Sequence, residues 1–436
     1  MALLEVKDLH TSFFTDAGEV KAVNGVSFNL DRGETLGIVG ESGSGKSVTV
    51  YSIMQILAPA GRIVSGSVKL DGQELVGAGE KVMRDVRGNK ISIIFQDPMT
   101  SLNPTYTIGD QLMEAILLHT DRTKQQAWDR AVEMLRLVNV NEPEKRMKQY
   151  PHEFSGGMRQ RVMIAMALAC EPDILVADEP TTALDVTIQA QILELMQKLQ
   201  KELGMAIIMI THDLGVVAQM CDEIVVMYAG SYCERGTADE IFYNPKHEYT
   251  KGLLRSIPTM STMGQKLQPI TGTPIDLLNL PKGCPFAPRC EAAMKVCIRQ
   301  APESMVINAD HKASCWMNVK AMAEKLGADA TSNALEQGLS LEEALAQGAE
   351  AEKQGLEATV TYVEESSYIR DEELRSARTQ AAEDVARSAG DPNHPFGDHG
   401  ADLIGDAGLM DARGAGSRIL KQSERAASHG EKGGEE

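Results

Sequence analysis

A glycine-rich segment near the start of the printed sequence has the residue types and spacing of a phosphate-binding loop. Residues 40–47 read GESGSGKS. Glycines allow the backbone to curl so that its N–H groups point at phosphate oxygens, while the lysine and the serine supply a cation and a hydroxyl. We expect Lys46 to reach the β- and γ-phosphates of a nucleotide and Ser47 to ligate Mg²⁺. The residues expected to contact the nucleotide are Gly40, Glu41, Ser42, Gly43, Ser44, Gly45, Lys46 and Ser47.

A pair of carboxylates later in the chain complements this loop. In DILVADE, at residues 173–179, four apolar residues predict a buried strand that ends in Asp178 and Glu179. We expect Asp178 to hold Mg²⁺, directly or through water, and Glu179 to polarise the attacking water as general base. Acidic residues often follow a strand, so the pair is informative because the phosphate loop accompanies it. Together the two motifs predict a P-loop NTPase.

Four further segments narrow the class of NTPase. SGGMRQ at residues 155–160 opens a predicted helix, whose serine and paired glycines can again face a phosphate. IIFQDP and IIMITHD each place a polar side chain after an apolar strand, and ALD follows the carboxylate pair. The candidate residues in these segments are Gln96, Ser155, Gly156, Gly157, Asp185 and His212. A lone glutamine or histidine is usually structural, but this set in this order indicates a functional site.

The segments that must position these residues alternate between short apolar runs and longer amphipathic stretches. Strands are predicted at 3–9, 35–39, 91–95, 174–177, 206–210 and 224–228, and helices at 47–57, 157–169 and 187–203. This alternation predicts an α/β fold around a largely parallel sheet, with the nucleotide loops at the carboxyl ends of strands. Polar helical segments interrupt the rhythm, and we interpret about residues 97–170 as a helical insertion.

In the order and spacing of these motifs, residues 1–257 resemble the ATP-binding subunit of an ABC transporter. The family signature usually reads LSGGQ, whereas this sequence reads FSGGM, at a position where importers tolerate variation. The resemblance implies a P-loop NTPase fold of ABC type, with a mostly parallel sheet core, an antiparallel β subdomain and a helical subdomain. It also implies ATP and Mg²⁺ as cofactors, and a head-to-tail dimer that sandwiches two ATP molecules.

The resemblance assigns a role to each motif. The phosphate loop, the carboxylate pair, Gln96 and His212 would act on one ATP, while the SGGMRQ helix and Asp185 would face the ATP of the partner subunit. Gln96 would sense Mg²⁺ and the attacking water, and His212 would contact the γ-phosphate and position that water. Because closing the dimer adds contacts only when the γ-phosphate is present, ATP would shift the equilibrium between open and closed states.

In the family, an aromatic side chain from an early strand stacks on the adenine. Leu9, Thr11 and Phe13 share one face of the first predicted strand, because side chains alternate along a strand. We choose Phe13 as the adenine platform, with Phe14 as the alternative. Stacking does not select a base, so the choice of ATP over GTP rests on the resemblance.

Three stretches, residues 95–112, 150–193 and 228–236, resemble the dipeptide and oligopeptide importer branch of the family. The implied function is ATP hydrolysis that energises peptide uptake. The implied partners are two permease subunits, a paralogous ATPase subunit in a head-to-tail heterodimer, and an extracytoplasmic peptide-binding protein that acts through the permease. The helical insertion would dock on the membrane subunits.

Four cysteines fall in a short segment beyond residue 257, with the spacing C-x5-C-x6-C-x17-C. They are Cys284, Cys290, Cys297 and Cys315. Four thiolates in a Pro/Gly-rich segment can close around a metal, and a region too small for a large core gains stability from such a site. The segment is similar to the C-terminal region of peptide-importer ATPases, which implies a 4Fe-4S cluster. Zinc and free thiols are the alternatives, and we interpret His311 as a structural residue rather than a ligand.

Composition bounds the class of protein and its location. The chain has 436 residues and a net charge of −19, which argues against a general nucleic-acid binder because such proteins carry a basic patch. No run reaches the roughly 18 apolar residues that a membrane span needs. The N-terminal MALLEVKDLH lacks the apolar core of a secretory signal. We expect a peripheral protein on the cytoplasmic face of the bacterial inner membrane, held there by its partners.

Three regions are predicted along the chain. They are an ATP-binding domain at 1–257, a C-terminal region with the four cysteines at 258–320, and an acidic tail at 321–436. The tail holds 24 Asp and Glu against 11 Lys and Arg, and 17 of its 116 residues are Leu, Ile, Val or Phe. This composition is typical of a disordered segment, and a docking arm for a partner is the alternative.

Three other functions match parts of the pattern. The cargo can be nickel, glutathione or another small solute, because nothing in this chain contacts the cargo. A soluble ABC ATPase acting on ribosomes or DNA usually has two ATPase halves or long coiled coils, whereas this sequence has one phosphate loop and no sustained heptads. A regulatory subunit that binds ATP without cleaving it is disfavoured, because Glu179 and His212 are both present.

Overall fold

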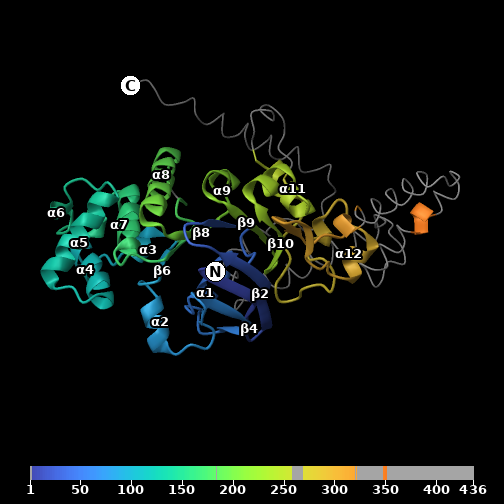
Figure 1. The fold of residues 1–436 in the computed structure, drawn as a ribbon, viewed down its shortest axis with the longest axis horizontal. Coiled ribbons are helices and arrows are strands. Elements are labelled where there is room, and N and C mark those ends of the chain that lie inside the picture. The colour runs from blue at the N-terminus through green and yellow to red at the C-terminus, as the bar shows by residue number, and fades with distance from the viewer. Residues whose placement is uncertain (1, 183, 258–268, 320, 322–346, 351–436) are drawn as a thin grey trace, which may run out of the picture. The chain divides into compact units, whose positions relative to one another are not determined.

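The computed structural model describes residues 2–182, 184–257, 269–319, 321 and 347–350 (Figure 1). The side chains of residues 98 and 99 are also outside the description. The predicted acidic tail lies outside the described residues, apart from residues 321 and 347–350.

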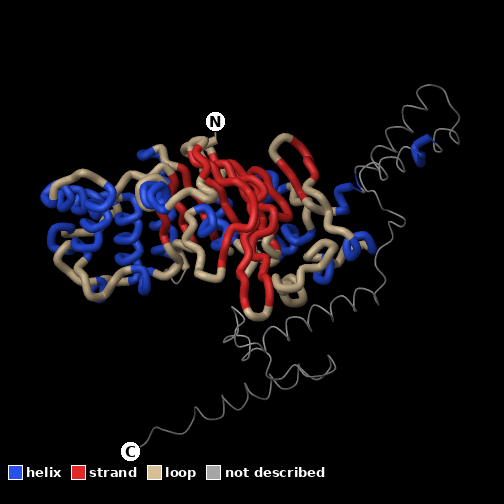
Figure 2. Tube along the Cα trace, turned by 90° about the horizontal axis from the view of Figure 1, so that it is seen from below, coloured by secondary structure: helices blue, strands red, loops and turns tan. Residues whose placement is uncertain are grey.

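Strands lie between two groups of helices (Figure 2). The strands are β1 (Leu4–Thr15), β2 (Gly18–Leu30), β3 (Thr35–Val39), β4 (Gly61–Leu70), β5 (Gln73–Glu74), β6 (Ile91–Ile94), β7 (Ile174–Asp178), β8 (Ala206–Thr211), β9 (Glu223–Tyr228), β10 (Ser231–Thr237), β11 (Met305–Asn308) and β12 (His311–Ala313). The helices are α1 (Lys46–Ile53), α2 (Glu80–Val86), α3 (Pro98–Ser101), α4 (Ile108–His119), α5 (Lys124–Leu137), α6 (Pro143–Arg146), α7 (Gly156–Leu168), α8 (Val186–Leu203), α9 (Leu214–Met220), α10 (Ala238–Tyr243), α11 (Glu248–Arg255) and α12 (Lys295–Arg299). Among the described residues, none of the helices is both long and apolar enough to cross a membrane.

The larger sheet has eight strands in the order β11-β12-β10-β9-β3-β8-β7-β6. The five strands from β9 to β6 run parallel, and β10, β12 and β11 are added antiparallel at one edge. The predicted α/β fold with a largely parallel sheet is therefore confirmed. The predicted strands at 35–39, 91–95, 174–177, 206–210 and 224–228 all belong to this sheet.

Both faces of the parallel sheet are buried, which explains its continuous apolar strands. In β8, Ile208 and Ile210 enter a core shared with α1 and the smaller sheet, while Ile207 and Met209 enter a core shared with α7 and α8. Side chains alternate along a strand, so a sheet covered on both faces needs apolar residues at every position. This burial holds the strand ends, where the candidate site residues lie, in fixed positions.

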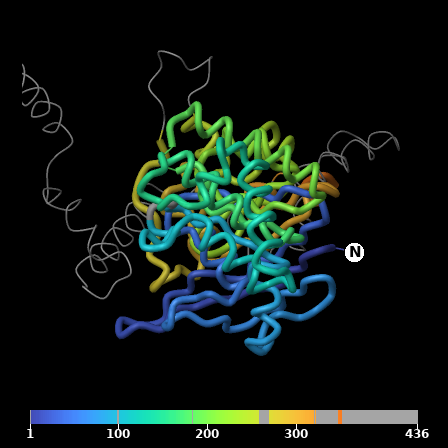
Figure 3. The backbone as a smooth tube through the Cα atoms, turned by 90° about the vertical axis from the view of Figure 1, so that its left-hand side faces the viewer, coloured from blue at the N-terminus to red at the C-terminus, as the bar shows by residue number. Residues whose placement is uncertain are grey.

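The smaller sheet is antiparallel, with the strand order β2-β1-β4-β5 (Figure 3, blue strands). Only one of these strands is predicted from the sequence, at 3–9, whereas β2, β4 and β5 are not. Register shifts between Val6 and Leu9 and between Thr11 and Ser12 interrupt the pairing of β1 with β2. Such bulges break the alternation of apolar and polar residues from which strands are predicted.

Between β6 and β7 the described chain folds into helices α3 to α7, and α4, α5 and α6 gather at one side (Figure 1). Capping boxes begin α4 and α5, in which Thr107 pairs with Asp110 and Thr123 with Gln126. These side chains satisfy backbone N–H groups that have no partner within the helix. The apolar faces of the helices enter the same core as α8.

The cysteine-containing region is attached to the larger sheet through β12, which pairs with β10. His311 in β12 is fully buried between two carboxylates, with Nε2 2.7 Å from Glu234 Oε1 and Nδ1 2.9 Å from Glu240 Oε2. Burial alone would lower the pKa of His311, but the hydrogen bonds and charges of both carboxylates outweigh burial and raise that pKa. The histidine therefore fastens this region to β10 and α10.

Candidate nucleotide-hydrolysis site

The predicted site residues gather at one edge of the larger sheet. The phosphate loop follows β3, the carboxylate pair ends β7, and Gln96 and His212 follow β6 and β8. These four strands are adjacent and parallel. Because the carboxyl ends of parallel strands lie at the same edge, the topology alone brings the four segments together.

Backbone curvature explains the glycines of the phosphate loop. Gly40 and Gly45 have φ angles of 151° and 96°, which residues with a Cβ rarely adopt. A Cβ at Gly40 would lie 2.2 Å from the main-chain oxygen of Met227, and one at Gly45 would lie 2.3 Å from that of Ala22. Glycine is required at both positions, because the φ angles are unfavourable for other residues and a Cβ would clash with a main-chain oxygen.

Lys46 is the first residue of α1, and its side chain folds back over the loop. Its Nζ donates to the main-chain oxygens of Gly40 at 2.8 Å and Glu41 at 2.9 Å. Burial lowers the pKa of Lys46, and the carboxylates of Glu179, Asp178 and Glu41 oppose that shift. The ammonium group is thus held against the curled backbone.

Two hydroxyls from α1 hold Asp178. Ser47 Oγ donates to Oδ1 and Tyr51 Oη donates to Oδ2, each at 2.9 Å. Tyr51 is not among the predicted site residues, although its spacing of four residues from Ser47 places both on one helix face. Burial raises the pKa of Asp178, and the two hydrogen bonds oppose that rise. Hydroxyl and carboxylate oxygens are ligands that Mg²⁺ prefers, so Ser47 and Asp178 suit a magnesium site.

Glu179 is the centre of a polar cluster. Its Oε2 accepts hydrogen bonds from Gln96 Nε2 at 2.7 Å and Thr182 Oγ1 at 3.0 Å, and its Oε1 lies 3.2 Å from His212 Nδ1. The φ angle of Glu179 is 49°, a strained conformation of the kind found at functional sites. Thr182, which is not among the predicted site residues, lies three residues after Glu179. The cluster orients a carboxylate that can accept a proton from water.

Ser155 and Asp185 begin two neighbouring helices. Ser155 Oγ accepts a backbone N–H in the first turn of α7 at 3.4 Å, and Asp185 Oδ1 accepts one in the first turn of α8 at 3.0 Å. A Cβ at Gly157 would lie 2.8 Å from Ile188 Cγ2, so the first turn of α7 packs against that of α8. The predicted residues Ser155, Gly156, Gly157 and Asp185 therefore lie side by side, as a second group.

Phe13 and Phe14 are neighbours in β1 and have different surroundings. Phe13 packs on Gly61, where an added Cβ would lie 2.7 Å from the ring. Phe14 is 39% exposed, and the guanidinium carbon of Arg62 lies 3.9 Å from its ring centroid. Because the Phe14 ring already stacks with Arg62, Phe13 is the better candidate to stack with adenine. The adenine platform stays a prediction.

The four predicted cysteines line one small cavity of about 20 Å³, together with Phe286 and Trp316. All four are free, and burial raises the pKa of Cys284 to about 12 and that of Cys315 to about 11. Within the described parts of the chain, no three His, Cys, Asp or Glu residues form a group that could hold a metal ion. The four thiols lie around a cavity with room for about one water molecule, and the 4Fe-4S cluster stays a prediction.

The sheet, the phosphate loop and the carboxylate cluster together define a P-loop ATPase of the ABC type. The family described as ABC transporter matches residues 23–182. The family described as Oligopeptide/dipeptide transporter, C-terminal region, matches residues 233–297.

Similar proteins of known name narrow the family to which the chain belongs. Dipeptide transport ATP-binding protein DppD of Bacillus subtilis is 55% identical over 316 residues, which are 72% of this chain and 94% of the relative. Oligopeptide transport ATP-binding protein OppD of the same organism is 57% identical over 72% of this chain and 88% of its own. OppD of Salmonella typhimurium is 53% identical over 73% and 94%. The chain belongs to the family of dipeptide and oligopeptide transport ATP-binding proteins.

Proposed function

We propose that this chain is the ATP-hydrolysing subunit that energises the uptake of dipeptides or oligopeptides through a membrane ABC importer. The observation that carries the proposal is the Glu179 carboxylate, which Gln96, Thr182 and His212 hold at the end of β7. A subunit that only binds ATP does not need an oriented general base. The C-terminal family match and the relatives' names support peptides as cargo.

Within one subunit, the loop N–H groups and Lys46 bind the β- and γ-phosphates. Ser47, Asp178 and Gln96 would hold Mg²⁺, which when bound neutralises phosphate charge. Glu179 takes a proton from the attacking water, and His212 orients that water against the γ-phosphate. The adenine stacks on Phe13.

A second ATPase subunit completes each site. In a head-to-tail dimer, Ser155, Gly156, Gly157 and Asp185 of one subunit face the ATP bound by the phosphate loop of the other. Helix N-termini present free N–H groups and positive potential to phosphate, and two such termini adjoin here. Contacts made with ATP and lost with ADP would drive closure. We propose a paralogous ATPase as the second subunit, with a homodimer as the alternative.

The other partners are two permease subunits and, through them, an extracytoplasmic peptide-binding protein. The helical insertion at about 97–170 docks on the permease, and its Tyr106 and Leu118 expose apolar side chains that suit such a contact. The subunit is then peripheral, at the cytoplasmic face of the bacterial inner membrane. The acidic net charge supports a function without nucleic acid.

The proposed division of the chain follows this function. It comprises the ATP-binding domain at 1–257, the importer-specific C-terminal region at 258–320, and an acidic tail at 321–436, most of which lies outside the described residues. Cys284, Cys290, Cys297 and Cys315 would hold a 4Fe-4S cluster, which would act as a staple for a region with a small core of its own. The shared cavity supports this assignment.

The test is uptake of labelled peptides, sorted by length, in cells that lack this chain. Wild-type chain should restore uptake of one length class, and Glu179→Gln should not, although it accumulates to the same level. Peptide uptake that is unchanged without the chain would contradict the proposal. Loss of nickel or glutathione uptake instead would assign the other cargo.

A further inference from the structure

The side chain of one phosphate-loop residue, Glu41, is held by the cysteine region. Arg289 Nη1 lies 2.6 Å from Glu41 Oε2, and Arg289 Nη2 lies 2.9 Å from Glu41 Oε1. The side chain of Arg289 is 5% exposed and that of Glu41 is 27% exposed. A two-pronged arginine–carboxylate pair that is largely buried is stronger and more directional than a surface ion pair.

Other contacts hold the Arg289 side chain in place beside Glu41. Its Nε donates to the main-chain oxygen of Thr271 at 3.1 Å, and its Nη1 lies 3.4 Å from Tyr228 Oη. Its guanidinium carbon lies 5.8 Å from the ring centroid of Tyr228 and 6.0 Å from that of Phe286. These contacts leave the guanidinium one orientation, so the position of Glu41 is set from outside the phosphate loop.

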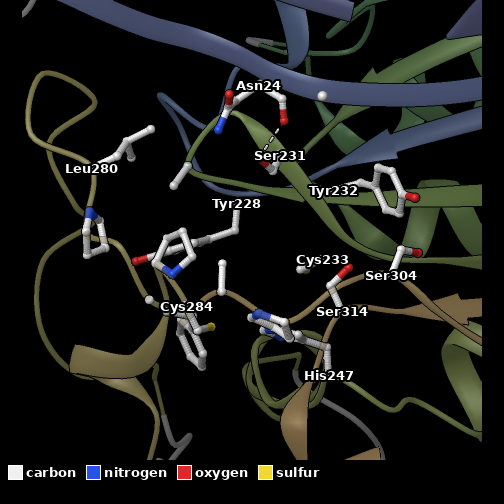
Figure 4. Close-up of a pocket in the computed structure, with 18 residues that line it drawn as sticks. Asn24, Tyr228, Ser231, Tyr232, Cys233, His247, Leu280, Cys284, Ser304 and Ser314 are labelled. Carbon is white, nitrogen blue, oxygen red and sulfur yellow. Dashed lines mark hydrogen bonds between the residues drawn. The ribbon is translucent and has the colours of Figure 1, made fainter. Parts of the chain in front are cut away.

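The main chain of Glu41 is held by α11, which precedes the cysteine region. Its N–H donates to Tyr249 Oη at 2.8 Å, and Tyr249 is fully buried. The rings of Tyr228, Tyr249 and Phe286 pack together, with centroids 4.8 to 5.3 Å apart. Tyr228 and Cys284 lie on the wall of an adjoining cavity of about 280 Å³, drawn in Figure 4.

The orientation of Glu41 matters because its main-chain oxygen accepts hydrogen bonds from inside the loop. It accepts from Lys46 Nζ at 2.9 Å and from the N–H of Ser44 at 3.2 Å. A glycine-rich loop that is free to move must be ordered when phosphate binds, and that ordering reduces affinity. A loop that is already fixed at Glu41 loses less entropy on binding.

We propose that Arg289 is a positioning residue for nucleotide binding. It holds Glu41, and through Glu41 it presets the phosphate loop and Lys46, without touching the nucleotide. Removal of the ion pair should weaken the binding of ATP and of ADP by similar factors, because both nucleotides carry the β-phosphate that the loop binds.

Calorimetric titration of the full chain with Mg-ATP and Mg-ADP tests this role. Arg289→Gln and Glu41→Gln should each raise both Kd values about tenfold. The double variant should be no more than about twofold weaker than the worse single variant, because both changes remove one contact. Arg289→Lys should be intermediate, since lysine keeps the charge and loses the fork. Unchanged Kd values in folded Arg289→Gln, or additive effects in the double variant, would overturn the proposal.

Arg235→Gln is a matched control. The Arg235–Glu223 pair is also two-pronged, at 2.6 and 2.7 Å, and joins β10 to β9 rather than reaching the loop. We expect Arg235→Gln to lower the melting temperature with nucleotide Kd values within twofold of wild type. An equal loss of affinity in this variant would make general destabilisation the cause and overturn the proposal.

A measurement on the unaltered protein covers the case in which the variants do not fold. Coupling between two sites is reciprocal. If Arg289 presets the phosphate loop, nucleotide bound to that loop should in turn reduce local opening of the segment that carries Arg289. Saturating Mg-ATP should slow amide hydrogen exchange in residues 284–290 of the wild-type chain. If ATP slows exchange in the phosphate loop but does not change the exchange rate of residues 284–290, the proposal is contradicted. The assignment of the chain as an ATPase would not be affected by that result.

Discussion

Gln96 Nε2 donates a hydrogen bond of 2.7 Å to Glu179 Oε2, and this contact joins the ends of β6 and β7. Oε1 of the same carboxylate lies toward His212. Glu179 is therefore oriented by fixed dipoles before any substrate arrives. A group arranged in this way contributes mainly to the chemical step rather than to binding.

Glu179→Gln should abolish turnover and preserve nucleotide binding. The amide has nearly the shape of the carboxylate but cannot accept a proton, so we expect hydrolysis to fall at least about 100-fold. The Kd for Mg-ATP should stay within about threefold, and an ATP-bound dimer with the partner ATPase should accumulate in light scattering. Glu202→Gln, at a surface residue near Lys198, is the control and should hydrolyse ATP normally. Normal hydrolysis by Glu179→Gln would remove Glu179 from the role of base.

The parts of the site that sequence could predict are those whose geometry is local. A glycine-rich turn between a strand and a helix, and polar residues at strand ends, are positioned by their own segments and by parallel topology. The contacts of Glu41 are different, because Tyr249 and Arg289 lie 208 and 248 residues away and no periodicity links them. Such contacts depend on how α11 and the C-terminal region pack against the phosphate loop, which the sequence pattern does not encode. The cysteine spacing similarly predicts a gathering of thiols but not what the thiols bind.

Phe13→Ala should weaken nucleotide binding more than Phe14→Ala. Removing an aromatic platform under a base costs about 1–3 kcal/mol, so the Kd for Mg-ATP should rise roughly 5- to 150-fold in Phe13→Ala. Phe14 stacks on Arg62, so Phe14→Ala should change the Kd less than twofold. Titration with a fluorescent ATP analogue measures both. The reverse order would make Phe14 the platform.

The His311 contact should make stability depend on pH in a defined direction. The pKa of His311 is raised in the folded state, so its stabilisation is complete below the unfolded value of about 6.5 and is lost as pH rises through the folded value. For Glu234, burial alone would raise the pKa, but His311 and two backbone N–H groups lower it. Its stabilisation is therefore present above the unfolded value of about 4.3 and is lost as pH falls through the folded value. The contact is strongest between these limits.

Replacing His311 tests this pH dependence. His311→Gln should lower the melting temperature by about 2–6 °C at pH 6 and by clearly less at pH 9. His152→Gln, at an exposed histidine, is the control and should show no such difference. Thermal unfolding in matched buffers provides the measurement. A deficit in His311→Gln that is the same at both pH values would show that the histidine contributes packing and not charge.

Anaerobic purification tests what the four cysteines hold. Four thiols line one cavity, so a cluster held by them would cross-link the segments that carry them and add to the small hydrophobic core of the region. We expect brown protein with broad absorbance near roughly 400 nm, about four iron atoms per chain, and bleaching in air. Cys290→Ala should lose the colour and lower the melting temperature, whereas Cys170→Ala, outside the cavity, should keep both. Colourless protein with one zinc per chain would show that the cysteines hold zinc instead of an iron–sulfur cluster. Metal-free protein in which all four thiols react with a thiol reagent would show that the cysteines hold no metal and have only a structural role.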